Sequence, residues 1–354
     1  MKKTGWLLCA ALIVGPAHGR QSPPPKLDAL LEAVTGAAHK IIETDPRDSF
    51  KNFDSLIVLH QGRTAFEKYY NGVQGGAPHQ MQSQTKSITA LLLGVAIDQG
   101  LIKSENEKVA PYFPESFAPG DKLKAAMTIK DLLTMSAGID WEEMLPQEDP
   151  KNDNAKMFRS DDWLAYVLAR PMAVPPGTVF EYNSGCPMLV AAIIEKASGQ
   201  SLEAFARKTL FEPLDIREFT WLKNAKGFCH AGGGLALKPM DMAKIGELAL
   251  NKGMWKGRRI VSEGWIERAV TPRFMTEFNA SGYGYFWWTK DYDLGEGRKT
   301  RVISSRGAGG QFTHILPDYG LVLAFTERNF TTPQVGGMIV EDLIEKLKSL
   351  PASK

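Results

Sequence analysis

Cysteine is scarce in this sequence of 354 residues. Its three cysteines are Cys9, Cys186 and Cys229, and the first lies in an N-terminal segment that we expect to be removed. The two that remain are too few for a disulfide scaffold. In an oxidising compartment they can pair or stay as buried thiols, and the sequence leaves both possibilities open.

An excess of charge of one sign is also missing. Lysine and arginine total 42 and aspartate and glutamate total 40, a formal net charge of +2. Removal of residues 1–19, which contain Lys2 and Lys3 and no acidic residue, leaves 40 − 40 = 0. A neutral chain lacks the basic surface that nucleic-acid binding requires, so we expect no nucleic-acid partner.

Several motifs of known catalytic and metal sites are absent. The sequence contains no Gly-x-Ser-x-Gly, His-Glu-x-x-His, Gly-x-x-x-x-Gly-Lys or Cys-x-x-Cys. The six histidines are scattered, and His230, which lies in a glycine-rich loop, is expected to be structural rather than catalytic. We therefore expect no metal site and no cofactor.

The N-terminal apolar run is far shorter than the ~20 residues that span a bilayer. Lys2 and Lys3 precede the apolar residues 6–14, and the small-residue segment Gly15-Pro16-Ala17-His18-Gly19 follows. This is the pattern of a secretory signal peptide. We expect cleavage near Gly19, a periplasmic or secreted protein, and no stable membrane insertion after cleavage.

The rest of the composition, 44% hydrophobic and 23% charged, is that of a globular protein with an ample core. Periodicity and turn residues predict a β-hairpin early in the chain, helices in the middle and strands again near the end. The predicted helices cover 27–42, 83–99, 129–135, 161–168, 188–197, 231–250, 263–270 and 336–348, and the predicted strands cover 56–60, 64–70, 283–288, 300–305, 311–316 and 321–326.

Strands at both ends of the chain predict one sheet built from the two termini, with a helical insertion between them. We place the signal peptide at 1–19, the sheet subdomain at 20–80 and 225–354, and the helical subdomain at 81–224. A catalytic cleft is expected between the two layers.

Ser83 and Lys86 stand where a polar segment leads into an apolar helix. The i, i+3 spacing puts both side chains on one face, with the amino group against the hydroxyl. A buried lysine in this place can accept the serine proton, and the free amides of the helix N-terminus can bind an oxyanion. The alternative is that Ser83 only caps the helix and that Lys86 is solvated.

Two later stretches carry further candidates. Tyr182 precedes a predicted helix, where a phenol near a lysine could shuttle protons; alternatively it is a half-buried tyrosine before a capped helix. The segment Ser304-Ser305-Arg306-Gly307-Ala308-Gly309-Gly310-Gln311 ends a strand with glycines, so its backbone can approach a ligand and lend an amide to an oxyanion hole. The alternative for this segment is a hairpin connection without chemistry.

In this order, the three stretches resemble the serine β-lactamase and penicillin-binding-protein superfamily. Within it the chain is similar to the class C β-lactamase-related serine hydrolases, which include family VIII esterases and 6-aminohexanoate-dimer hydrolases. The resemblance also covers segments 135–141, 176–178, 233–235 and 309–312. It implies an α/β (α+β) fold of the β-lactamase/transpeptidase type, an antiparallel sheet flanked by helices with an inserted helical subdomain.

Residue by residue, the resemblance implies that Ser83 is the nucleophile, Lys86 its activating base and Tyr182 the second acid/base. The backbone amides of Ser83 and Ala308 would form the oxyanion hole. The positions that would contact substrate are Trp141, on the cleft wall, and Ser184, Ser305, Gly307 and Gly309. The alternative for Trp141 is that its indole packs in the helical core, because large aromatic side chains are usually buried.

Two departures from the family pattern bear on the substrate. Ser184 stands where class C β-lactamases have the asparagine of Tyr-x-Asn, so side-chain recognition of a β-lactam amide is in doubt. Ser305-Arg306-Gly307 replaces Lys-Thr-Gly, and alternation along the strand aims Arg306 away from the face of Ser305. The usual anchor for a substrate carboxylate is therefore missing.

These observations predict an exported serine hydrolase that forms and hydrolyses an acyl-enzyme on a small-molecule ester or amide. A first alternative is a D,D-peptidase or β-lactamase. A second is a non-catalytic protein that binds cell-wall peptides in the same cleft. The sequence does not indicate an oligomeric state.

Overall fold

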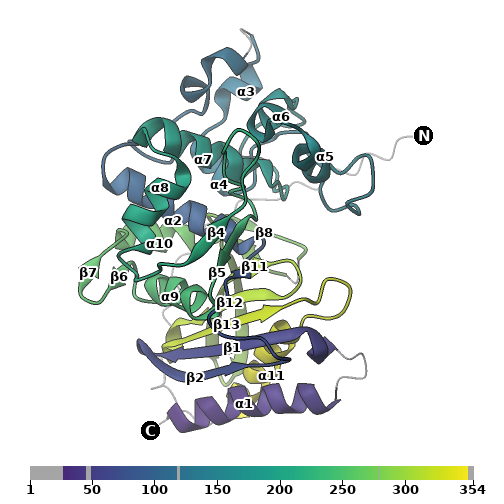
Figure 1. Cartoon of the computed structure of the whole chain (residues 1–354), viewed down its shortest axis with the longest axis vertical. Helices are drawn as coiled ribbons and strands as arrows, with labels where there is room; N and C mark the ends of the chain where they lie inside the picture. The colour runs from purple at the N-terminus through teal and green to yellow at the C-terminus, as the bar shows by residue number, and fades with distance from the viewer. Residues whose placement is uncertain (1–26, 45–48, 118–119, 279, 350–354) are drawn as a thin grey trace.

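The computed structural model describes residues 27–44, 49–117, 120–278 and 280–349, so the expected signal peptide lies outside the described residues. Figure 1 shows helices packed on both sides of a large sheet at one end and a mostly helical part at the other. The helices are α1 (Leu27–Thr44), α2 (Gln84–Asp98), α3 (Lys122–Ala126), α4 (Ile129–Leu133), α5 (Asp153–Arg159), α6 (Trp163–Ala169), α7 (Gly185–Ser198), α8 (Leu202–Ala206), α9 (Pro239–Leu250), α10 (Glu263–Ala269) and α11 (Val335–Ser349).

Within the described residues the main sheet has eight strands in the order β2-β1-β13-β12-β11-β10-β9-β8. Each neighbouring pair is antiparallel, as expected. The strands are β1 (Phe53–His60), β2 (Arg63–Tyr69), β3 (His79–Gln80), β4 (Phe219–Trp221), β5 (Leu235–Leu237), β6 (Met254–Trp255), β7 (Arg258–Arg259), β8 (Phe274–Met275), β9 (Gly282–Tyr283), β10 (Trp288–Gly295), β11 (Arg298–Gly307), β12 (Gln311–Leu316) and β13 (Leu321–Glu327).

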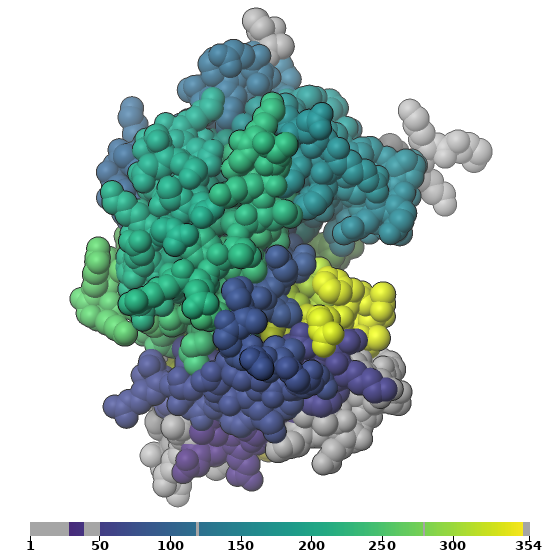
Figure 2. Space-filling view, viewed as in Figure 1, coloured from purple at the N-terminus to yellow at the C-terminus, as the bar shows by residue number. Residues whose placement is uncertain are grey.

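The two ends of the described chain meet in this sheet, because β1 pairs with β13. Figure 2 shows the same arrangement on the surface, where blue segments from the early chain lie beside yellow segments from its end. The teal middle of the chain occupies the opposite end of the molecule. The hairpin of β1 and β2 is thus joined to the C-terminal strands only by tertiary pairing.

Alternation along the central strands divides the interior into two cores. Val322 and Ala324 of β13 belong to the core that contains α2, α7 and α9. Leu323 and Phe325 belong to the core that contains α1 and α11. Strands covered on both faces are mostly apolar, and β13 is buried throughout its length, with polar residues only at its end, Thr326 and Glu327.

Helix α2 passes through the larger core, and its residues from Gln84 to Ala96 are all buried. Gly94 lets the indole of Trp265, on α10, lie directly against the helix. A Cβ at Gly94 would stand 2.3 Å from the Trp265 ring. The same indole donates a hydrogen bond of 3.0 Å to the carbonyl of Ala90, which fixes its position.

Two predicted elements differ from the structure. The strand expected over 283–288 is interrupted between β9 and β10, because the backbone of Gly284 presses against the carbonyl of Ala269 and the amide of Phe286 donates to Leu133. The helix expected over 231–250 begins only at Pro239, since residues 235–237 form strand β5 beside β3 and β4. In both places long-range contacts override the local pattern.

Cys186 and Cys229, whose state the sequence left open, are free and buried. Burial raises the pKa of the Cys186 thiol and raises that of Cys229 to about 12, so both thiols stay protonated at neutral pH. Among the described helices, none has the length and apolar composition that crossing a membrane requires.

The contact between α2 and Trp265 gives a test of the packing. Gly94→Ala should lower the free energy of unfolding by about 1–3 kcal/mol, because the new methyl group overlaps a fixed indole. The matched control is Gly337→Ala on α11, where a Cβ would meet only an atom of Phe312 at 4.0 Å. That change should stabilise by about 0.5–1 kcal/mol through helix propensity. Urea unfolding measures both, and equal effects of the two substitutions would contradict this packing.

Candidate active site

Ser83 occupies the N-cap position of α2, and its side chain makes no capping hydrogen bond. Instead its Oγ accepts a hydrogen bond of 2.8 Å from Nζ of Lys86. The residue before it, Gln82, has a φ of 50°, an uncommon backbone conformation for a residue with a Cβ. The hydroxyl is therefore directed at the lysine and does not cap the helix.

Lys86 is 1% exposed and lies within the core. Its Nζ donates to Ser83 and, over 2.7 Å, to the carbonyl oxygen of Gly232. It also lies 4.8 Å from the centre of the Tyr182 ring. In the part of the chain that the structure describes, no carboxylate forms an ion pair with this lysine. A desolvated amine at hydrogen-bond distance from a serine hydroxyl is placed to take its proton.

His230 lies close enough to this lysine to feel its charge, and neither of its ring nitrogens forms a hydrogen bond with another described residue. Its ring packs edge-on against Phe158 and Trp163, with centroids 5.2 and 5.3 Å away. Burial and then the charge of Lys86 lower the pKa of His230 to about 3, so the imidazole is neutral at pH 7. Its position is that of a packed aromatic group beneath the site.

Tyr182 belongs to an aromatic wall beside the serine and lysine. Its ring stacks on Trp288 with centroids 5.9 Å apart and meets the edges of Tyr283 and Phe278 at 6.4 and 6.5 Å. Phe278 is 38% exposed, so one side of the wall is open to solvent. The sequence did not single out Trp288 or Phe278. Trp288 comes beside Tyr283 through the pairing of β10 with β9, and Phe278 lies in the turn between β8 and β9, which are paired.

Glu143 is a further residue that the sequence did not single out. One carboxylate oxygen accepts the hydroxyl of Ser184 at 2.8 Å. The other accepts the backbone amide of Ser184 at 2.6 Å and the indole N–H of Trp141 at 2.7 Å. This carboxylate therefore fixes the turn that carries Tyr182, at the start of α7, where a negative charge is favourable. Because the Ser184 hydroxyl donates to Glu143, it can meet a ligand only as an acceptor.

Trp141 does not have the exposed cleft position that the sequence led us to expect. It is 2% exposed and packs edge-on against Tyr166 at 6.2 Å. Its indole is part of the core and acts on the site only through the hydrogen bond to Glu143. The apolar wall of the site is provided by the Phe278 and Trp288 side chains in its place.

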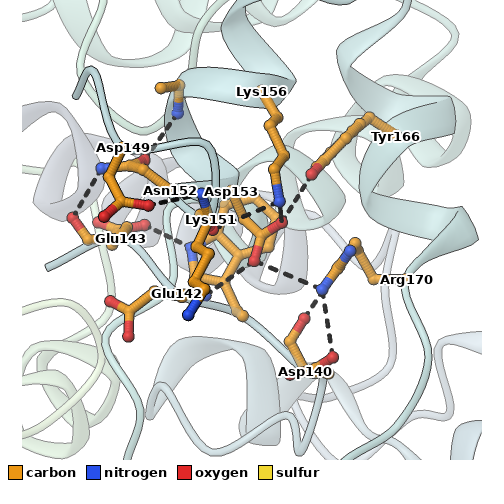
Figure 3. A network of polar contacts seen from close by, with 12 residues as sticks. Asp140, Glu142, Glu143, Asp149, Lys151, Asn152, Asp153, Lys156, Tyr166 and Arg170 are labelled. Carbon is orange, nitrogen blue, oxygen red and sulfur yellow. Dashed lines mark hydrogen bonds and ion pairs between the residues drawn. The ribbon is translucent and has the colours of Figure 1, made fainter. Parts of the chain in front are cut away.

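A polar network holds the loop that carries Glu143 (Figure 3). At its centre, the buried carboxylate of Asp153 accepts the Tyr166 hydroxyl at 2.7 Å and the backbone amide of Glu142 at 2.9 Å. Arg170 bridges Asp153 and Asp140 at 3.4 and 3.2 Å. Buried charges with several partners restrict the conformation of the loop, and the loop in turn fixes the position of Glu143.

The end of β11 packs against the turn that leads into Ser83. A Cβ on Gly307 would stand 2.2 Å from the carbonyl oxygen of Met81 and 3.0 Å from the side chain of Gln82. Only glycine permits this approach, which brings the following residue, Ala308, beside the start of α2. Gly309, with φ 77°, then turns the chain. It packs against the ring of Phe330, from which a Cβ at this position would stand 2.8 Å.

The two faces of β11 point in different directions, as the alternation predicts. Ser305 pairs with Thr313, whose hydroxyl donates to Gln84 of α2 at 2.9 Å, so this face is toward the serine. Arg306 points to the other face, and its guanidinium lies 5.3 Å over the ring of Trp288. The arginine therefore does not take the place of the absent lysine on the face of Ser305.

Within the described ranges, no group of three or more histidine, cysteine, aspartate or glutamate side chains is arranged to hold a metal ion. The chemistry that the arrangement supports is that of its own side chains: a serine hydroxyl, a lysine amine and a tyrosine phenol, with backbone amides nearby.

Known proteins share both sequence and fold with this chain. A profile of the family described as Beta-lactamase matches residues 53–337. The 6-aminohexanoate-dimer hydrolase of Paenarthrobacter ureafaciens is 26% identical over 309 residues, 82% of this chain and 74% of that protein. Two solved structures resemble the fold. A proposed 6-aminohexanoate-dimer hydrolase from Bacillus anthracis has a TM-score of 0.73 at 21% identity, covering 88% of this chain and 82% of that one. A family VIII carboxylesterase has a TM-score of 0.69 at 18% identity, and the match covers 92% of this chain and 99% of the carboxylesterase.

The burial of Trp141 predicts a stability effect. Trp141→Ala should lower the free energy of unfolding by about 3–5 kcal/mol, because it empties a core position. Trp141→Phe keeps most of the packing but removes one donor to Glu143, so a smaller loss of about 1–3 kcal/mol is expected. Chemical denaturation measures both. A Trp141→Ala protein as stable as the parent would show that the indole is not part of the core.

Proposed function

Because the chain belongs to the beta-lactamase family, a family of hydrolases, we propose that it is an exported serine hydrolase that forms and hydrolyses an acyl-enzyme on Ser83. The substrate is a small ester or amide with an uncharged apolar arm. The observation that carries this proposal is the hydrogen bond of 2.8 Å between Lys86 and Ser83, with Lys86 buried and without a carboxylate partner.

The proposed reaction uses these groups in two halves. Lys86 accepts the hydroxyl proton as Ser83 Oγ attacks the carbonyl carbon, and the backbone amides of Ser83 and Ala308 stabilise the oxyanion. Tyr182, in contact with Lys86, passes a proton to the leaving alcohol or amine. A water molecule then attacks the acyl-enzyme, and the serine recovers its proton when the carboxylic acid leaves.

The electrostatics beside Tyr182 favour a substrate without a carboxylate. Burial, and then the carboxylates of Asp140, Glu142, Asp153 and Glu143, raise the pKa of Glu181 to about 7. Burial is the larger cause of this shift, and the four carboxylates add negative charge around the residue next to Tyr182. Since Arg306 faces away, nothing described in the cleft replaces the lysine of Lys-Thr-Gly. Both features disfavour the first alternative, a D,D-peptidase or β-lactamase, whose substrates carry a carboxylate.

Export is proposed from the N-terminal segment alone, with Lys2, Lys3 and the apolar residues 6–14 as its support. N-terminal sequencing of the protein produced in a bacterial host tests it. A mature chain that begins near Gln21 is the expected result, and a chain that retains residues 1–19 would contradict export with cleavage.

Removal of the nucleophile tests the reaction. Ser83→Ala should lower kcat/KM for p-nitrophenyl esters by roughly 10⁴-fold or more, because the nucleophile and its base act as a unit. Ser262→Ala is the matched control, since Ser262 also precedes a helix, α10, without a side-chain capping bond. The control should keep full activity. Esterase activity that survives Ser83→Ala would overturn the assignment.

The alternatives are separated by a fluorophosphonate probe and a substrate screen. The proposed enzyme is labelled on Ser83 and turns over esters or short amides faster than nitrocefin or D-amino-acid peptides. Absence of labelling would favour a protein that binds cell-wall peptides without chemistry. Efficient nitrocefin turnover would favour a β-lactamase.

A further inference from the structure

A cavity of about 770 Å³ lies between α11 and strands β10 to β12. It is on the face of the sheet opposite α2, away from Ser83. The two regions meet at Trp288, whose ring stacks on Tyr182 and also lies against Arg306. Its volume falls within the ~300–1,000 Å³ of small-molecule sites. The residues that matter for its chemistry are Arg306, His314, Phe312, Lys290, Glu341 and Gly337.

Arg306 brings to this cavity a positive charge that is not part of an ion pair. Its Nε is buried without an acceptor, and no hydrogen bond or ion pair joins its guanidinium to another described residue. The guanidinium carbon lies over one face of the Trp288 ring, 5.3 Å from the ring centre. Burial lowers the pKa of Arg306, whereas the charge of Glu341 acts in the opposite direction, and an arginine remains charged at neutral pH. The side chain as a whole is half-buried, so its charge is only partly solvated, and an anion at the guanidinium stabilises it.

The other charges that line the cavity are already paired. Lys290 Nζ lies 2.9 Å from Glu341, which also accepts the Tyr292 hydroxyl at 2.7 Å. Asp342 lies 3.1 Å from Lys346. The lining as a whole carries two positive and two negative side chains, and Arg306 is the one of these four that is without an ion-pair partner among the described residues. It can therefore pair with one negative charge on a ligand.

Uncharged groups complete the lining. His314 is 4% exposed, and its Nδ1 lies 2.8 Å from the Ser304 hydroxyl. Its Nε2 is buried without a partner, and when Ser304 donates to Nδ1 this nitrogen is a donor. The ring of Phe312 stacks on His314 at 4.9 Å, and Met338 adds an apolar surface. Burial and then Arg306 lower the pKa of His314 to about 3, so it adds no second charge at pH 7.

We propose that this cavity binds a small organic monoanion, a carboxylate with an apolar body. The carboxylate pairs with the guanidinium of Arg306, which can bind both oxygens at once. The body packs on Phe312 and Met338. A multiply charged phosphate ester does not fit, because only one positive charge is free.

The proposal is tested by calorimetric titration of the full-length protein with 3-phenylpropanoate and with its neutral analogue 3-phenylpropanamide. The carboxylate should bind saturably, and the amide at least roughly tenfold more weakly, because it lacks the charge that pairs with Arg306. Equal affinity for the two compounds would overturn the proposal, and so would the absence of saturable carboxylate binding at millimolar concentrations.

Variants locate the site. Arg306→Gln should weaken carboxylate binding at least roughly tenfold. Arg301→Gln is the matched control on the same strand, where the guanidinium bonds to Asp291 at 2.5 and 2.8 Å, outside the cavity. It should bind as the parent does. Carboxylate affinity that is unchanged in Arg306→Gln would place the ligand elsewhere and contradict the proposal.

A second variant does not depend on the charge. Gly337 lines the cavity on α11, and its Cβ position is open apart from Phe312 at 4.0 Å. Gly337→Leu therefore fills the space, keeps Arg306 and improves helix propensity. Binding of the carboxylate should be lost although the protein folds. Parental affinity in Gly337→Leu would overturn the proposal even if Arg306→Gln failed to fold.

Discussion

The contact between the end of β11 and the turn before α2 is the constraint on which the catalytic centre depends. Gly307 lies so close to the Met81 carbonyl that a Cβ would stand 2.2 Å from it. This approach joins the sheet to the helix that carries Ser83 and Lys86. The serine, the lysine and the strand that leads to Ala308 come from segments far apart in the sequence, and only this packing brings them together.

A second layer holds the tyrosine. Asp153 and Arg170 fix the loop that carries Glu143, and Glu143 binds the backbone and side chain of Ser184, two residues after Tyr182. The indole of Trp141 completes the partners of Glu143. Side chains that never meet a substrate thus restrict the position of the phenol, as precise sites require.

The local pattern of the sequence was sufficient to predict the helix and strands that carry the candidate catalytic residues. The start of α2 at Ser83, the central strands and the side to which Arg306 points all follow from periodicity. The roles of Trp141, Glu143 and Trp288 could not be predicted from one sequence. Trp141 is a large aromatic residue beside a motif, and only its contact with Tyr166 assigns it to the core. The predicted strand 283–288 is interrupted at Gly284, where the backbone packs against the carbonyl of Ala269. Trp288 therefore lies on a separate strand, and its ring stacks on Tyr182.

Activation of Ser83 by Lys86 should set the rate of acyl-enzyme formation, so this rate is the quantity to measure. The parent protein and Lys86→Met are each mixed with an excess of a p-nitrophenyl ester, quenched over time and mapped by mass spectrometry. The parent should acquire the acyl group on Ser83, and Lys86→Met should acquire it more slowly by roughly 10³-fold or more. Acylation of another residue, or equal rates in the two proteins, would contradict activation of Ser83 by Lys86.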